Sequence, residues 1–185
     1  PLAASKDLEA LYRLALLLQD ADDIHGRAAQ QPHEQDLHRP RRAVVPSYLG
    51  GLNAFSVYGA KLKGIPLDDQ GMIPEELAET VSHLRQLGKK IKFIYIIPDF
   101  QNPAGITIPE SRRLKIIEIA EKYDLLVIED SPYREIRFEG EPQRMMCELD
   151  TTGRVISLCT FSKILSPGFR VGWVIGNEEI IDRMV

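Results

Sequence analysis

A lysine preceded by two hydroxyl residues and followed by an arginine stands near the end of the chain. The stretch Thr160-Phe161-Ser162-Lys163 contains the lysine, and Arg170 follows it by seven residues, after a Pro-Gly turn. A lysine amine forms a Schiff base with an aldehyde, and hydroxyls with a planar guanidinium suit a phosphate group. Pyridoxal phosphate (PLP) carries both groups on one ring. The pattern favours an anchored PLP, although a strand followed by a basic turn would contain the same residue types.

Two further polar groups follow apolar, strand-like runs. Asn102 stands in the turn-forming stretch 99–105, and Asp130 precedes Ser-Pro and Tyr133. A protonated pyridine nitrogen requires a buried carboxylate, and the phenolic oxygen of PLP requires donors such as an amide and a tyrosine hydroxyl. Asp130, Asn102 and Tyr133 are candidates for these contacts. Simple turn chemistry at Asn102 and a helix or turn cap at Asp130 remain open alternatives.

Strand-like and helix-like segments alternate along the chain from residue 44 onward. Apolar runs predict buried strands at 92–98, 125–128, 155–158 and 171–175, and a shorter strand at 60–67. Helical spacing of apolar residues predicts helices at 74–88 and 109–123, and 46–51 is typical of a turn that enters a helix. This alternation predicts an α/β fold, a three-layer α/β/α arrangement with a mostly parallel sheet whose strand order cannot be read. Ligands of such sheets bind beyond the strand ends.

Composition places the chain among ordinary globular proteins. Of 185 residues, 44% are hydrophobic and 27% charged, with a formal net charge of −4. No basic footprint favours nucleic acid, and no apolar run has the length of a membrane span, so neither partner is expected. Cys147 and Cys159 are the two cysteines, which excludes a disulfide framework and favours a cytoplasmic location.

The first 43 residues differ in character from the rest. Residues 1–24 contain a helix-like apolar periodicity, whereas 25–42 are polar, broken by prolines and without a core face. Three histidines in this segment, His25, His33 and His38, have no neighbouring groups that would orient metal ligands. We interpret them as solvated side chains and expect no metal site.

Three motifs together resemble the fold-type I PLP enzymes, specifically class I/II aminotransferases of the branch that contains kynurenine/aminoadipate aminotransferases and the aminotransferase-like domains of MocR-type regulators. The motifs are DFQNPAG (99–105), EDSPY (129–133) and TFSK (160–163) with GFRVG (168–172). Their spacing also fits this branch: Asn102 precedes Asp130 by 28 residues, and Asp130 precedes Lys163 by 33.

The resemblance implies a role for each candidate residue. Lys163 would be the Schiff-base lysine that also moves the proton during catalysis, and Asp130 would face the pyridinium. Asn102 and Tyr133 would contact the phenolic oxygen of the cofactor. The phosphate would be held by Thr160, Ser162 and Arg170, and Tyr48 would stack on the ring face. The implied cofactor is pyridoxal 5'-phosphate, the substrates are an amino acid and a 2-oxo acid, and the full-length protein would be a homodimer.

The resemblance covers residues 44–185, which it identifies as part of a PLP-binding large domain. The family's phosphate-binding helix start and its Asp-Pro-Gly-Asp segment are not found in residues 1–43. The family's small domain, with the arginine that binds the substrate carboxylate, would follow residue 185. We therefore expect an incomplete domain with little activity on its own. A one-base shift in a permitted back-translation of 33–42 reads MSKIFIDPGE, which suggests that this segment is translated out of frame.

The motifs describe cofactor binding and leave the reaction open. An aminotransferase is the leading hypothesis. A carbon–sulfur lyase or a decarboxylase on the same cofactor is an alternative, and so is a MocR-like sensor domain that binds PLP without turnover. The sensor would require a winged-helix domain, for which residues 1–43 are too short and insufficiently basic. The substrate side chain cannot be read from the sequence.

Overall fold

The computed structural model of the chain describes residues 47–57, 59–182 and 184. The predicted helix within residues 1–24, the polar segment 25–42 and its proposed frame shift lie outside the described residues. The predicted helix entry at Tyr48 is confirmed, because α2 (Leu49–Val57) begins directly after it.

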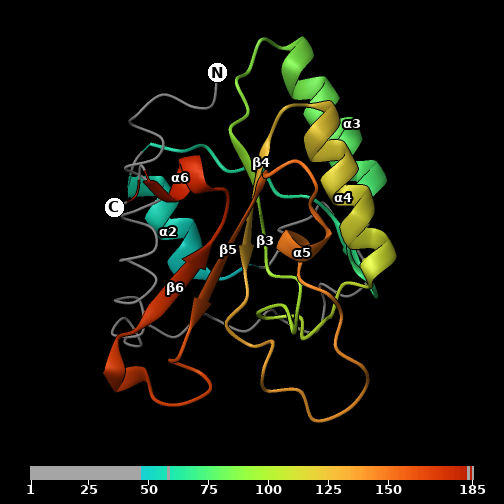
Figure 1. Cartoon of the computed structure of the whole chain (residues 1–185). Helices are drawn as coiled ribbons and strands as arrows, with labels where there is room; N and C mark the ends of the chain where they lie inside the picture. Colours follow the sequence, from blue (N-terminus) through green and yellow to red (C-terminus); the bar gives the residue numbers. More distant parts are fainter. Residues whose placement is uncertain (1–46, 58, 183, 185) are drawn as a thin grey trace, which may run out of the picture.

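A four-stranded sheet forms the centre of the fold (Figure 1). Its strands are β3 (Phe93–Ile96), β4 (Leu126–Asp130), β5 (Val155–Thr160) and β6 (Gly172–Ile175), and their order in the sheet is the order in the sequence. β3 and β4 pair in parallel, as do β4 and β5, whereas β6 runs antiparallel to β5. The expected mostly parallel sheet is confirmed, and the antiparallel β6 follows from the short connection between β5 and β6, which cannot make a parallel crossover.

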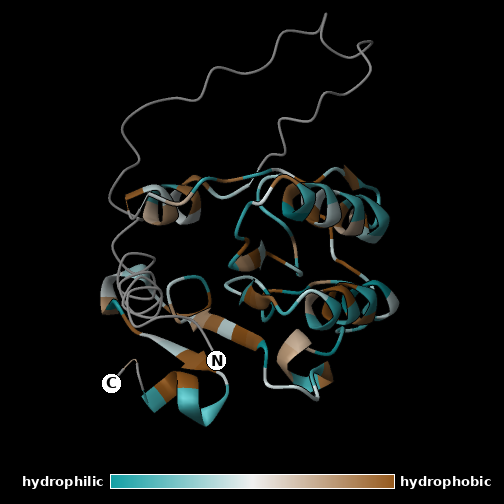
Figure 2. Ribbon diagram, turned by 90° about the horizontal axis from the view of Figure 1, so that it is seen from above, coloured by the Kyte–Doolittle hydropathy of each residue, from teal (hydrophilic) through white to brown (hydrophobic). Residues whose placement is uncertain are grey.

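Helices cover both faces of this sheet. α3 (Pro74–Gln86), α4 (Glu110–Lys122) and the short α5 (Met146–Leu149) pack on one face, where Ile94, Val127 and Val155 join their apolar side chains in one core. α2 and α6 (Glu178–Asp182) pack on the other face against Ile128, Ile156 and Leu158. Neighbouring strand residues thus enter different cores, which explains why the strands are apolar on both faces. Figure 2 shows the corresponding mixture of hydrophobic and hydrophilic residues on the helices.

Two sequence predictions need correction. The strand expected at 60–67 is absent from the described residues, where 60–66 has no regular structure and Leu67–Asp68 (β1) pairs only with Gly71–Met72 (β2). An alternating pattern cannot form a strand without a partner edge, and Pro66 further shortens the run. The helix predicted at 109–123 would hold Pro109 in its first turn, but α4 begins at Glu110, and Pro109 is the N-cap residue with an extended ψ of 151°.

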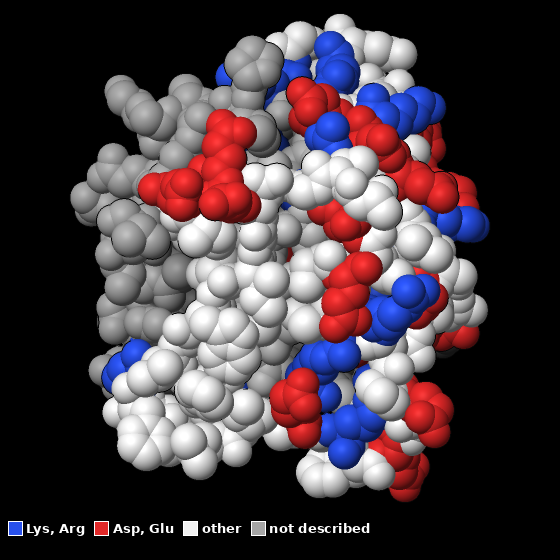
Figure 3. Space-filling view, in the orientation of Figure 1, with Lys and Arg blue, Asp and Glu red and all other residues white. Residues whose placement is uncertain are grey.

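The face of the molecule shown in Figure 3 has a charged part and a part with few charges. In Figure 3, acidic and basic side chains gather over α3 and α4, whereas the area over β5 and β6 carries few charges. Exposed apolar side chains on and beside β6 include Phe169, Val171 and Trp173. None of the described helices is long and apolar enough to cross a membrane.

Candidate active site

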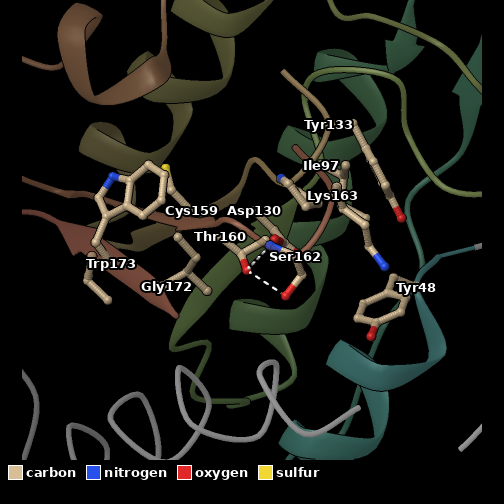
Figure 4. A pocket seen from close by; sticks show the side chains of 13 residues that line it. Tyr48, Ile97, Asp130, Tyr133, Cys159, Thr160, Ser162, Lys163, Gly172 and Trp173 are labelled. Atoms are coloured by element: carbon tan, nitrogen blue, oxygen red, sulfur yellow. Dashed lines mark hydrogen bonds between the residues drawn. The ribbon is translucent and has the colours of Figure 1, made fainter. Parts of the chain in front are cut away.

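A pocket lies at the carboxyl ends of the parallel strands, and six of the eight predicted site residues line it (Figure 4). They are Tyr48, Asp130, Tyr133, Thr160, Ser162 and Lys163. Asp130 is the last residue of β4, and Thr160 is the last residue of β5. The remaining wall is contributed by Ile97, Pro132, Leu158, Cys159, Gly172, Trp173 and Val174. Side chains from segments more than a hundred residues apart therefore meet in one concave site.

Lys163 lies in the turn that follows β5. The Leu165 backbone N–H donates to the Phe161 carbonyl at 2.9 Å, and the Phe161 N–H donates to the Val171 carbonyl at 3.1 Å. These bonds fix the turn against the start of β6 and leave the Lys163 side chain exposed to the pocket. In Figure 4, Lys163, Tyr48 and Tyr133 lie on one side of the pocket, and Trp173 lies on the other. A lysine in this position is accessible to a ligand carbonyl.

Thr160 and Ser162 form a small hydroxyl cluster at the end of β5. The Ser162 backbone N–H donates to Thr160 Oγ1 at 3.1 Å, and the two hydroxyl oxygens are 3.0 Å apart. Thr160 Oγ1 also lies 3.2 Å from the Val171 carbonyl oxygen. Two hydroxyls held by backbone contacts can exchange these bonds for a phosphate oxygen without moving the main chain.

Asp130 is a buried carboxylate at the base of the pocket. Tyr95 on β3 donates its hydroxyl hydrogen to Asp130 Oδ2 at 2.6 Å. Within residues 47–184 as described, no other hydrogen-bond donor contacts the Asp130 side chain. Burial raises the pKa of Asp130 to about 6, and the Tyr95 hydrogen bond opposes this rise. The structure shows no helix-cap or turn-cap hydrogen bond from a described backbone N–H to this carboxylate.

Asn102 meets Tyr133 at the rim of the site. The Asn102 side-chain amide donates to the Tyr133 hydroxyl at 3.2 Å, which joins the loops that follow β3 and β4. Asn102 itself is not among the residues that line the pocket. The peptide bond between Asn102 and Pro103 is cis.

Arg170 is, with Asn102, one of the two predicted site residues that do not line the pocket. It follows the 3-10 helix η3 (Pro167–Phe169), has a left-handed backbone with φ of 52°, and is half-buried. It does not line the pocket, although the strand that begins two residues later does so through Gly172 and Trp173.

The loop that carries Asn102 is anchored by a buried ion pair. Arg113 on α4 donates to Asp99 Oδ1 at 2.8 Å, and both side chains are fully buried. The same guanidinium donates to the carbonyls of Ile108, Pro98 and Arg144 at 2.9, 3.2 and 2.9 Å. Five donors of arginine can serve such a loop because they are fixed in one plane.

Glu129, on the face of β4 opposite Asp130, holds the start of α5. Its carboxylate accepts hydrogen bonds from the Met146 and Cys147 N–H groups at 2.9 and 3.3 Å and from the Ser157 hydroxyl. Burial raises the pKa of Glu129, and these three bonds oppose the rise. The sequence motif contained Glu129 without indicating this contact to α5.

Comparisons with known proteins assign the chain to a family. The family model for aminotransferases of class I and II matches residues 43–185. The chain belongs to this family. It is 48% identical to aromatic-amino-acid aminotransferase 1 of Thermococcus litoralis over 166 residues, which is 90% of this chain and 39% of that protein. It is also 37% identical over 139 residues to an uncharacterized HTH-type transcriptional regulator, YisV, of Bacillus subtilis, covering 75% of this chain and 28% of the regulator.

A solved aminotransferase structure shares the fold. The crystal structure of Pyrococcus horikoshii kynurenine aminotransferase, described as a complex with PMP and kynurenine, superposes with a TM-score of 0.73 at 50% identity. The match covers 75% of this chain and 34% of that chain. The chain thus spans about two fifths or less of the length of these relatives. The resemblance to class I/II aminotransferases is confirmed, and with it the fold.

Sequence reasoning missed one site residue that the structure places beside Asp130. Tyr95 was seen only as part of the apolar run 92–98, yet its hydroxyl is the donor to the Asp130 carboxylate. A buried tyrosine hydroxyl usually has a hydrogen-bond partner, so a tyrosine in a strand covered on both faces indicates a polar contact. The partner depends on strand pairing, which places Tyr95 opposite Ile128, two residues before Asp130.

Proposed function

We propose that the complete protein is a PLP-dependent aminotransferase that transfers an amino group between an amino acid and a 2-oxo acid. The observation that carries the proposal is one pocket lined by Lys163, by the buried Asp130 carboxylate and by the Thr160–Ser162 hydroxyl cluster. Membership of the class I and II aminotransferase family supports it. An aromatic amino acid is the proposed amino donor, because one relative is named for aromatic amino acids and another for kynurenine.

The residues fit PLP at both ends of the ring. Asp130 is buried with one hydrogen-bond donor among the described residues, so a cationic ring N–H would complete its contacts. At the other end, Thr160 and Ser162 offer hydroxyls to the phosphate, and the family resemblance adds Arg170. The Tyr133 hydroxyl and the Asn102 amide, which already contact each other, would hold the phenolic oxygen. Tyr48, at the pocket wall, would lie against the ring face.

The reaction divides between cofactor and protein. Bound PLP would supply an electron sink that stabilises negative charge at the substrate α-carbon. Lys163 would hold the carbonyl end of the cofactor through its Nζ atom, and the freed amine would then take the proton from the α-carbon. The Asp130 carboxylate would keep the ring nitrogen charged from within a buried, pre-arranged site.

The proposal is tested by amino-group transfer in the full-length protein that the gene encodes. An aromatic amino acid labelled with ¹⁵N is incubated with 2-oxoglutarate and PLP, and ¹⁵N-glutamate is measured. We expect label transfer by the wild type and by Lys115→Ala, which alters an exposed lysine on α4, and at least a thousandfold loss in Lys163→Ala. Label transfer that survives in Lys163→Ala would contradict the proposed role of this lysine.

The same incubation, and a parallel one with a sulfur-containing amino acid, separate the alternatives. A decarboxylase would release carbon dioxide in the first, and a carbon–sulfur lyase would release a thiol in the second. A sensor domain would bind PLP and leave the amino acid unchanged. The match to the HTH-type regulator favours retaining this last possibility as an outcome of the test.

A further inference from the structure

Tyr95 connects Asp130 to α2, which packs on the sheet face opposite α3 and α4. It lies on β3, and its ring meets Phe55 of α2 edge to face with centroids 5.2 Å apart. Its hydroxyl donates a hydrogen bond at 2.6 Å to Oδ2 of Asp130, the last residue of the neighbouring strand β4. This length is typical of a hydroxyl that donates to an ionised carboxylate, which is a stronger bond than one between neutral groups.

The backbone of α2 lies close to the Tyr95 hydroxyl at Gly51. A Cβ atom added at Gly51 would lie 2.7 Å from the Tyr95 hydroxyl oxygen and 2.9 Å from its Cζ atom. Non-bonded carbon and oxygen atoms do not approach this closely, so the phenol occupies space that only a glycine at this position leaves open. Gly51 is buried, which leaves the ring little freedom to move aside. The hydroxyl is thus confined between the helix and the carboxylate.

The chemistry of the pair follows from this confinement. Burial, the charge of Asp130 and its hydrogen bond raise the pKa of Tyr95 well above its ordinary value, so the phenol remains a donor at neutral pH. The Tyr48 and Tyr133 hydroxyls are the other titratable groups that act on Tyr95. One oxygen of Asp130 is occupied by Tyr95, while the carboxylate as a whole lines the pocket.

We propose that Tyr95, supported by Gly51, is a positioning residue of the site: its hydroxyl holds Asp130 Oδ2 and thereby turns the other carboxylate oxygen toward the ring nitrogen of the bound cofactor. The inference rests on the proposed function for the identity of that cofactor. Tyr95 does not line the pocket and would act through Asp130 alone. Nothing in its role requires it to touch the substrate.

The test compares Tyr95→Phe with Tyr123→Phe in the full-length protein. Tyr123 follows α4 and lies outside the site, so its variant controls for the loss of a phenol. The first measurement is the titration of the Asp130 side-chain carboxyl by ¹³C NMR without cofactor. We expect Tyr95→Phe to raise its midpoint by about one pH unit, because the lost hydrogen bond favoured the ionised form. The second measurement is PLP affinity at pH 8, which should weaken about tenfold.

A second variant keeps the proposal testable if Tyr95→Phe fails to fold. Gly51→Ala retains both Tyr95 and Asp130, but its added methyl group would displace the Tyr95 hydroxyl. It should therefore raise the Asp130 midpoint and weaken PLP binding, as Tyr95→Phe does. Gly176→Ala is its control, because an added Cβ there meets no atom closer than 3.7 Å. An unchanged Asp130 midpoint, or unchanged PLP affinity, would overturn the role of Tyr95. A wild-type protein that does not bind PLP would instead overturn the proposed function, and the NMR titration separates the two failures.

Discussion

The Asn102 amide donates a hydrogen bond to the Tyr133 hydroxyl at 3.2 Å, although the two residues follow different strands and are 31 residues apart. The contact joins the loops after β3 and β4 at the mouth of the pocket. In the proposed complex both groups turn to one oxygen of the cofactor, so each orients the other before binding. Pre-arranged donors lose less entropy when a ligand arrives.

We therefore predict that Asn102→Ala and Tyr133→Phe are coupled. Each variant alone should weaken PLP binding about tenfold, because one donor to the phenolic oxygen is lost. The double variant should lose less PLP affinity than the product of the two single-variant losses, which corresponds to a coupling energy of about 0.5–1.5 kcal/mol. Spectroscopic titration of PLP into the four proteins measures the cycle. Strictly additive effects would show that the two side chains do not act on the same atom.

A second prediction concerns the cost of the buried Asp130 charge. In the folded protein the pKa of Asp130 is about 6, against an ordinary value of 3.8, so the folded state binds this proton more tightly than the unfolded chain. Stability without cofactor should therefore fall as the pH rises from about 4 to 6. Asp130→Asn removes this loss and should raise the free energy of unfolding at pH 7 by at most about 3 kcal/mol, with little effect near pH 4.

Urea unfolding of the cofactor-free protein at pH 4 and pH 7 measures this difference. Asp69→Asn is the matched control, since Asp69 is exposed. The same Asp130→Asn variant should lower amino-transfer turnover by at least a hundredfold, because the ring nitrogen loses its anionic partner. A variant less stable than the wild type at pH 7 would contradict the account of the isolated charge.

The positions of Lys163 and Asp130 could be predicted from the sequence, whereas the contact between Tyr95 and Asp130 could not. Lys163 and Asp130 were predictable because each follows an apolar run, and the ends of parallel strands meet at one edge of a sheet. The partnership of Tyr95 with Asp130 was not, because it depends on register across β3 and β4. The strand expected at 60–67 was wrong because alternation alone does not supply a neighbouring strand.

The roles of the site residues stay predictions, and so does the division of the chain at residue 44. Arg170 shows the limit most clearly. Its spacing from Lys163 indicated a phosphate contact, yet it does not line the pocket, and the conformation of the Pro-Gly turn before it could not be read from residue types.

Arg113 supports a third prediction, on stability. Arg113→Met should lower the free energy of unfolding by about 3 kcal/mol, because the buried Asp99 carboxylate would lose its shorter ion pair and keep only the 3.3 Å contact with Arg137. Three carbonyls would lose a donor as well. Lys115→Met on the same helix is the control, since its ion pair with Glu75 is exposed and contributes less than about 1 kcal/mol. Chemical denaturation of both variants compares them, and equal losses would mean that the buried pair anchors nothing.

Glu129 offers a contrast to Asp130 on the same strand. It accepts three hydrogen bonds, two of them from the N–H groups at the start of α5. Glu129→Gln keeps the size but turns one acceptor into a donor that faces an N–H group. We expect a loss of about 1–3 kcal/mol in the free energy of unfolding and faster hydrogen exchange at Met146 and Cys147. Glu118→Gln, on the exposed side of α4, should change neither quantity.

The central claim is that Lys163 holds the cofactor, and peptide mapping after borohydride reduction tests it most directly. The full-length protein is incubated with PLP, reduced, digested and analysed by tandem mass spectrometry. We predict one stoichiometric adduct of reduced cofactor on the peptide that contains Lys163, and its disappearance in Lys163→Ala. A stoichiometric adduct on another lysine, or none in a protein that transfers amino groups, would contradict the account.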